Sequence, residues 1–335
     1  EAVSSHEIFS NTNSRTFPED VIISFEAGAG EFPEGVVMDK EGNLYVGLAP
    51  LGKILRIKRD GSTETVVTLS SQLLGLTVDT KGIIYAAVNA PLSPDNGVWR
   101  IDPEDPTQPE LLPGTGNIFF PNSLTFDRRG NLYVTSTTGP PLGDGTFGKG
   151  SIWRIPPGGQ AELWLADELL TGLITNLIPQ PLPLGANGIV HRNRTLYVAN
   201  TSKKHVVRIP IDPKGNPSEP EMIASFAEDP GNPDPNKADG ALDGITVDSR
   251  GNLYLLLIAE HRVVRIRPDG SVMTTVATTE NSLHSPASAV FGTTGSDQMS
   301  LFLTNFALPT FPNQPTNPTG PAVVKVDVGI PGMPQ

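Results

Sequence analysis

Residues 33–47 read PEGVVMDKEGNLYVG. The apolar residues 36–38 and 44–47 flank a turn, DKEGN at 39–43, in which Gly and Asn supply the backbone freedom that a tight turn requires. The stretch therefore predicts two antiparallel strands joined by a short hairpin. One residue does not fit a plain hairpin. Glu34 is an acid placed directly before an apolar strand instead of in the turn.

The same pattern recurs along the whole chain. Close copies start at Gly75 (GLTVDTKGIIYAA), Ser123 (SLTFDRRGNLYVT) and Gly244 (GITVDSRGNLYLL), and weaker ones at Gly188 (GIVHRNRTLYVAN) and Ser288 (SAVFGTTGSDQMSLFLTN). Successive starts lie 40, 48, 65, 56 and 44 residues apart. Strand-rich repeats at such a spacing indicate similar sheets arranged around a common axis.

Each unit continues with a third strand that carries Arg or Lys near its end. These strands read KILRIK, GVWRID, SIWRIP, HVVRIP, RVVRIR and AVVKVD. A fourth strand follows in most units, but the sixth lacks one, and DVIISF at 20–25 precedes the first unit without a partner. We therefore predict an all-β, six-bladed β-propeller with four antiparallel strands per blade, in which residues 20–25 complete the last blade and close the ring.

The repeats resume on both sides of the Pro-rich segments, which are therefore loops and not linkers between domains. We expect a single propeller domain over residues 20–328, with an N-terminal extension at 1–19 and a C-terminal tail at 329–335. A helix is expected at one place. The segment AELWLADELLTGLITNL, residues 161–177, begins as the fourth strand of blade 3 and turns helical after Ala166.

Composition and charge exclude several classes of partner. The net charge is −12 and Lys and Arg do not cluster, which argues against nucleic acid or anionic lipid. No run of 18 apolar residues is available to span a membrane, and without Cys there is no thiol nucleophile. We expect a small-molecule partner and a monomer or weak oligomer. The start at Glu1 fits a removed leader, hence a secreted or periplasmic protein, but equally a cytoplasmic one.

The longest insertions lie at 136–150, 165–186, 227–242 and 305–321. They connect second to third strands or successive blades, so we expect all four on one face, where each innermost strand begins. Long loops on a rigid scaffold usually carry function. His205 and His261 are expected on this face as exposed loop residues, and His284 near the channel mouth; all three are candidates for a substrate pocket. The Leu, Pro and Phe residues at 173–184 and 306–311 favour a hydrophobic substrate.

Alignment of the six repeats brings the residues that precede the innermost strands into one register at the channel mouth. They are Glu34, Leu74, Asn122, Asn187, Asp243 and Ala287. Carboxylate and amide oxygens are the ligands that Ca²⁺ prefers, so four positions predict a cation site, and Leu74 and Ala287 are candidates for contact with substrate. Asn122 and Asp243 could instead form only local turns, but that interpretation explains neither Glu34 nor the shared register.

With this set of residues the chain resembles the SMP-30/gluconolactonase/luciferin-regenerating-enzyme group of six-bladed propellers, which is related to paraoxonases and squid-type diisopropylfluorophosphatase. The resemblance extends over residues 20–328. It implies that Glu34, Asn187 and Asp243 bind a catalytic Ca²⁺, or another divalent ion such as Zn²⁺, Mn²⁺ or Mg²⁺. It also implies that Asn122 binds the ion or contacts substrate or water. Strictosidine-synthase-like propellers share the fold but lack this set.

Some relatives hold a second calcium through an aspartate three residues after the metal-binding Asp, where this chain has Thr246, so that second site is not expected by this route. The implied activity is metal-dependent hydrolysis of lactones or related esters, with Asp243 as general base or nucleophile and Asn122 beside it. Phosphotriester hydrolysis on the same metal is one alternative. A propeller that only binds a ligand or protein, and a biosynthetic propeller with non-hydrolytic chemistry, are the others.

Overall fold

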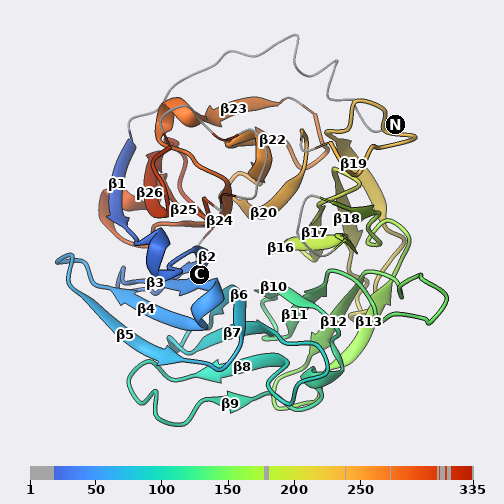
Figure 1. The fold of residues 1–335 in the computed structure, drawn as a ribbon, viewed down its shortest axis with the longest axis horizontal. Coiled ribbons are helices and arrows are strands. Elements are labelled where there is room, and N and C mark those ends of the chain that lie inside the picture. Colours follow the sequence, from blue (N-terminus) through green and yellow to red (C-terminus); the bar gives the residue numbers. More distant parts are fainter. Residues whose placement is uncertain are drawn as a thin grey trace.

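The computed structural model describes residues 19–176, 181–237, 239–271, 273–307, 309, 314 and 318–333. Within these residues, six antiparallel four-stranded sheets are arranged around a central axis (Figure 1). The prediction of an all-β, six-bladed propeller is confirmed. No helix in the described part of the chain combines the length and apolar character needed to cross a membrane.

The first three blades comprise β2 (Pro33–Met38), β3 (Leu44–Leu48), β4 (Lys53–Ile57) and β5 (Thr63–Thr68); β6 (Gln72–Val78), β7 (Ile84–Asn89), β8 (Gly97–Ile101) and β9 (Glu110–Leu111); and β10 (Pro121–Phe126), β11 (Leu132–Ser136), β12 (Ser151–Ile155) and β13 (Glu162–Ala166). The other three comprise β16 (Ala186–Arg192), β17 (Thr195–Asn200), β18 (His205–Pro210) and β19 (Glu221–Ser225); β20 (Leu242–Val247), β21 (Leu253–Leu257), β22 (Arg262–Ile266) and β23 (Thr274–Ala277); and β24 (Pro286–Phe291), β25 (Ser300–Asn305), β26 (Ala322–Asp327) and β1 (Glu19–Ser24). In blades 1 to 5 the strands follow one another in chain order from the centre outwards (Figure 1).

Short elements join these strands. A two-stranded ribbon, β14 (Ile174–Thr175) with β15 (Leu182–Pro183), lies between blades 3 and 4 in the chain. The 3₁₀ turns are η1 (Ala27–Ala29), η2 (Ala49–Leu51), η3 (Thr115–Asn117), η4 (Ile258–Glu260), η5 (Thr279–Asn281) and η6 (Gly295–Met299).

The ring closes as predicted. Strand β1 pairs antiparallel with β26, so that Asp20 lies opposite Lys325 and Ser24 opposite Ala322. The outermost strand of blade 6 therefore comes from the beginning of the chain and its other three strands from the end. The strand occupies residues 19–24, one position earlier than the predicted 20–25.

The repeated turn of the opening motif is held by its first aspartate. Asp39 Oδ1 accepts the backbone N–H of Asn43 at 2.8 Å, and Oδ2 accepts the Asn43 amide at 2.8 Å and the Tyr45 hydroxyl at 3.2 Å. Asp127 and Asp248 bind their own Asn and Tyr in the same way. The motif D-x-x-G-N-L-Y is therefore a clamp that fixes the first hairpin of a blade.

The cationic residue of each third strand also has a structural partner. Arg56, for example, lies directly across from Tyr45 on the second strand. The same cross-strand pairing joins an aromatic residue to Arg or Lys in the other five blades. Such pairs stabilise the sheet within a blade.

Apolar side chains fill the seams between neighbouring blades. Leu242 of blade 5, for example, packs in one cluster with Ala199 of blade 4, and Leu73 of blade 2 packs with Ile54 of blade 1. Burial of these flat faces against each other provides most of the hydrophobic stabilisation of the ring.

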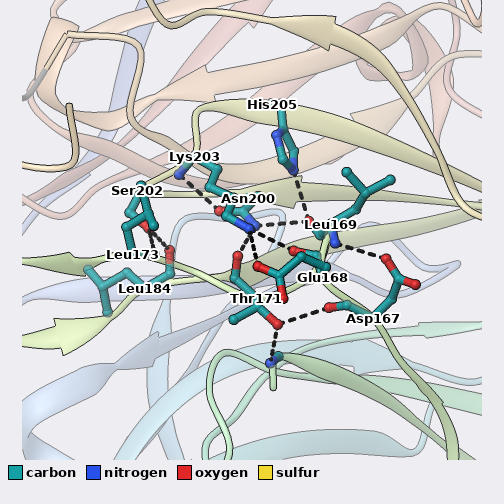
Figure 2. Close-up of polar contacts among 11 residues, drawn as sticks. Asp167, Glu168, Leu169, Thr171, Leu173, Leu184, Asn200, Ser202, Lys203 and His205 are labelled. Atoms are coloured by element: carbon teal, nitrogen blue, oxygen red, sulfur yellow. Dashed lines mark hydrogen bonds and ion pairs between the residues drawn. The ribbon is translucent and has the colours of Figure 1, made fainter. Parts of the chain in front are cut away.

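The expected helix after Ala166 is wrong. The chain makes a single turn at 167–171, in which Thr171 N–H reaches the Asp167 carbonyl, and then forms β14. The carbonyls that would continue a helix are used by blade 4 instead: Asn200 Nδ2 donates to those of Leu169 and Thr171 at 3.0 and 3.1 Å (Figure 2). A tertiary anchor has overridden the local helical pattern.

Candidate active site at the channel mouth

Every innermost strand carries a β-bulge at the same place. In blade 1, Pro33 pairs with Leu48 and Val36 with Val46, so Glu34 and Gly35 together face one residue of β3. The register shifts at the equivalent point in the other five blades. The residues in these bulges are Glu34, Leu74, Asn122, Asn187, Asp243 and Ala287. They lie within the strands and not before them as predicted, but in one register, and we call them the ring residues.

The residue after the ring residue is Gly in blades 1, 2, 4 and 5, where the next blade approaches closely, and Ser in blades 3 and 6. A Cβ on Gly35 would lie 2.4 Å from the Leu74 carbonyl oxygen, and one on Gly188 would lie 2.6 Å from that of Asp243. Gly75 and Gly244 meet the carbonyls of the next ring residues in the same way. Each of these four bulges is therefore packed directly against the backbone of its neighbour.

In blades 3 and 6 the contact between the bulge and the next blade is made differently, by a threonine from the second strand. Thr304 Oγ1 donates to the Glu34 carbonyl at 2.6 Å and accepts the Ser288 N–H at 3.0 Å. Thr135 Oγ1 likewise donates to the Asn187 carbonyl at 2.8 Å and accepts the Ser123 N–H at 3.0 Å. The backbones of two oxygen-bearing ring residues are thus fixed by hydrogen bonds from the preceding blade.

The two acids of the ring are buried and act on each other. Glu34 and Asp243 are 7% and 8% exposed. Burial, followed by the negative charge of Asp243, raises the pKa of Glu34 well above its usual value. Burial also raises the pKa of Asp243 to about 7, an effect that the neighbouring Asn187 amide opposes. The ring thus holds two acids whose charges are costly unless a cation balances them.

One oxygen of this pair has no partner. Glu34 Oε2 is buried and accepts no hydrogen bond from the described residues. An orphaned buried carboxylate oxygen is rare and calls for an explanation such as an ion. Leu74 and Ala287, the ring residues on either side of Glu34, are both buried and offer no side-chain donor. The carboxylate and amide oxygens of the other four ring residues are ligands that suit a hard divalent cation.

The two amides of the ring are held by threonines that the sequence interpretation did not identify. Asn122 Nδ2 donates to Thr137 Oγ1 at 3.0 Å, and Asn187 Nδ2 donates to Thr201 Oγ1 at 3.1 Å. The sequence did contain a signal. At this position, four residues after the aromatic residue of the second strand, Thr occurs only in the two blades whose ring residue is Asn.

The prediction that His205 and His261 are exposed loop residues is wrong, because both side chains are buried; His284 is buried as well. His205 is the first residue of β18, 5% exposed, and its Nε2 lies 2.8 Å from the Leu169 carbonyl (Figure 2). Burial lowers the pKa of His205 to about 4. A histidine that is neutral and bonded to the backbone in this way anchors the loop at 167–171.

His261 and His284 are buried as a pair. Their rings meet edge to face with centroids 5.6 Å apart. His261 Nδ1 accepts the Ser285 N–H at 2.8 Å, and His284 Nε2 lies 2.7 Å from Gln314 Oε1. Both side chains are therefore fixed, and contact of either with substrate stays a prediction.

An open cavity of about 490 Å³ lies over blades 2 and 3 at the same face. Its lining residues are Leu92, Ser93, Pro94, Asn96, Gly116, Asn117, Phe119 and Pro140. The apolar segments that we expected to line a pocket, 173–184 and 306–311, lie partly outside the described residues. Within the described residues, no group of three or more His, Cys, Asp or Glu side chains is placed to hold a metal ion; the ring has two acids and two amides.

The fold and the site together define a class, a six-bladed propeller whose innermost strands carry two acids and two amides in one register. The family model described as the SMP-30/Gluconolactonase/LRE-like region matches residues 119–306, and the chain belongs to this family. A second model, described as the N-terminal strictosidine synthase-like region, matches residues 24–57.

Solved structures share this fold. A luciferin-regenerating enzyme is 16% identical with a TM-score of 0.68, over 95% of this chain and 98% of that one. Regucalcin from Agrobacterium tumefaciens, a calcium-binding protein, is 16% identical with a TM-score of 0.66, over 97% and 98%. A gluconolactonase from Xanthomonas campestris is 18% identical with a TM-score of 0.65, over 94% and 90%. No curated protein sequence matches the chain.

Proposed function

We propose that this protein is a divalent-cation-dependent hydrolase of lactones or related esters, with Ca²⁺ as the first candidate cation. The observation that carries the proposal is the buried Glu34 carboxylate oxygen, which has no partner among the described residues, in one ring with Asp243, Asn122 and Asn187. Family membership supports it, and one solved relative is a gluconolactonase and another a calcium-binding protein.

The ring residues have separate roles in this proposal. Glu34 and Asp243 supply two negative charges and the two Asn residues supply neutral oxygens, which together would hold the cation. A cation bound there supplies positive charge that polarises a substrate carbonyl. Asp243 would accept a proton from the attacking water as a general base, or would attack the carbonyl itself. Asn122 binds a substrate oxygen or the cation.

The substrate we propose is a small molecule with an apolar part. Leu92, Pro94 and Phe119 give the open cavity an apolar lining at the same face as the ring. A phosphotriester is the second candidate substrate, because it would present an oxygen to the same cation and the same acid. Binding or biosynthetic functions without hydrolysis are outcomes that the following test separates.

The test is a panel of lactones, aryl esters and phosphotriesters assayed with and without chelator. We expect hydrolysis that chelator removes, that added Ca²⁺ restores, and that Asp243→Asn lowers by at least about a hundredfold. Glu34→Gln should weaken cation binding while it keeps the side-chain volume. Turnover that survives complete removal of divalent cations would contradict the proposal. Stoichiometric cation binding without turnover of any panel member would favour a binding protein.

A further inference from the structure

The ring amides raise a question of orientation, because an Asn side chain has one end that accepts hydrogen bonds and one that donates them. Only Oδ1 can bind a cation. When Oδ1 is used in this way, both N–H groups of Nδ2 must find acceptors elsewhere, since a buried unpaired donor costs about 1–3 kcal/mol. The carboxylates of the ring are strong acceptors, and the Asn187 amide is hydrogen-bonded to that of Asp243. Without a second partner on the other side, such an acceptor would draw Nδ2 towards the place where a cation should bind.

Each of two threonines supplies one of these acceptors, in the same geometry in both blades. Thr137 and Thr201 are buried, and each is anchored through its backbone N–H to the residue two positions before its Asn: Thr137 to the Phe120 carbonyl at 3.0 Å and Thr201 to the Gly185 carbonyl at 3.1 Å. Each hydroxyl then accepts Nδ2 of its Asn at 3.0 or 3.1 Å. The other four blades have Ala49, Asn89, Ile258 and Phe306 at this position.

We propose that Thr137 and Thr201 are positioning residues that turn the oxygens of Asn122 and Asn187 towards the ring centre and thereby set the affinity of the site for a hard cation. This inference rests on the proposed function, since it assumes that the ring binds a divalent ion. The threonines touch neither substrate nor cation; they act through the amides. Partners of this kind usually contribute about 10–100-fold to metal affinity.

The experiment compares Thr137→Val and Thr201→Val, which keep the side-chain shape and remove the hydroxyl, with Thr137→Ser and Thr201→Ser, which keep the hydroxyl. Thr115→Val is the matched control. Thr115 is equally buried, and its hydroxyl bonds the Val98 N–H and the Leu112 carbonyl in blade 2. Ca²⁺ binding is measured by isothermal titration calorimetry on the full chain, and the unfolding temperature is measured in the Ca²⁺-free form.

We expect each Val variant to bind Ca²⁺ about 10–100-fold more weakly, each Ser variant to stay within about threefold of the wild type, and Thr115→Val to lose unfolding temperature but not affinity. Val variants that bind Ca²⁺ as tightly as the wild type would overturn the inference and leave the cation site standing. Ser variants that fail to restore the affinity lost in the Val variants would overturn it as well. A wild-type protein that takes up none of Ca²⁺, Mg²⁺, Mn²⁺ and Zn²⁺ would overturn the proposed function together with the inference.

Discussion

Glu34 and Asp243 share one ring, and burial raises the pKa of both carboxyl groups. An acid whose pKa is higher in the folded state binds more protons folded than unfolded, so its contribution to stability is full below the unfolded pKa of about 4. For Asp243 that contribution is lost as the pH rises through the folded pKa of about 7. The cation-free ring therefore destabilises the fold at neutral pH.

Asp243→Asn should remove this effect, because the amide stays neutral at every pH. In the presence of chelator, we expect the free energy of unfolding of the wild type to fall relative to the variant as the pH rises from about 4 to about 8. Urea denaturation at a series of pH values measures the difference. With saturating Ca²⁺ the wild type should become more stable than the variant at the upper end of this range, since it then gains the free energy of binding. Parallel pH profiles of the two proteins without cation would contradict the raised pKa of Asp243.

The contribution of His205 to the free energy of unfolding should change with pH in the opposite direction. Its pKa falls to about 4 in the folded state, so its contribution to stability is present above the unfolded pKa of about 6.5 and is lost as the pH falls through the folded value. The loss amounts to roughly 3 kcal/mol. His205→Gln keeps an N–H donor for the Leu169 carbonyl but cannot take up a proton. We expect the acid-induced loss of stability to shrink in this variant, measured in the same denaturation series.

The identity of the ring residues could be predicted from the sequence, because one bulge recurs at one register and an alignment of the repeats is enough to find it. The burial of His205 could not be predicted. It depends on the carbonyl of Leu169, 36 residues earlier, which only the folded loop brings within 2.8 Å. Thr137 and Thr201 occupy one column of the aligned repeats and occur only where the ring residue is Asn, which is a signal in the sequence. The contact behind that signal, a side chain four residues after an aromatic that reaches an amide in the neighbouring strand, is seen only in the fold.

At the scale of a strand, the bulge is what converts a hairpin into part of a site. A β-bulge places two residues opposite one and redirects the side chain between them. Here it recurs in all six innermost strands. Its glycine or serine follows the ring residue in each repeat of the sequence. That small residue is visible in the sequence, but the reason for the glycine in four of the blades, the carbonyl of the next blade, is visible only in the fold.

Gly188→Ala tests this close approach. A Cβ there would lie 2.6 Å from the Asp243 carbonyl oxygen and 2.7 Å from the Ile245 nitrogen, so blades 4 and 5 must separate. We expect a loss of about 1–3 kcal/mol in the free energy of unfolding and weaker Ca²⁺ binding. Gly28→Ala is the control, because nothing lies within 4 Å of its Cβ position. Equal stability of the two variants would show that the seam tolerates the extra atom.

Over the whole molecule, the six blades and their closure follow from the repeat, since each copy carries the same cross-strand pair and blades 1, 3 and 5 also carry the same turn clamp. The segment after Ala166 departs from its local pattern because Asn200, at the end of β17 in blade 4, binds its carbonyls, a long-range contact that a window of sequence cannot contain. We propose that the propeller behaves as one domain, because apolar clusters join each blade to the next around the ring.

The pairing of β1 with β26, which closes the ring, should stabilise the whole propeller. Removal of residues 1–24 deletes β1 and leaves the edge of β26 unpaired, whereas removal of residues 1–18 leaves β1 in place. We expect the longer truncation to unfold several degrees earlier and to aggregate on heating, because an exposed strand edge pairs with other chains. The shorter truncation should unfold in one transition, as expected for one domain. Calorimetry and light scattering on the two proteins measure both effects.

The bulge also fixes the backbone at each ring position independently of the side chain there. The six ring positions share the same register shift, and they carry two acids, two amides, a leucine and an alanine. The side chain at a ring position can therefore change while the architecture stays constant. Leu74 and Ala287, which flank Glu34, are the two ring residues whose side chains carry no oxygen. An acid installed in either would add a third carboxyl group to the ring, so the chemistry of the ring can be changed one residue at a time.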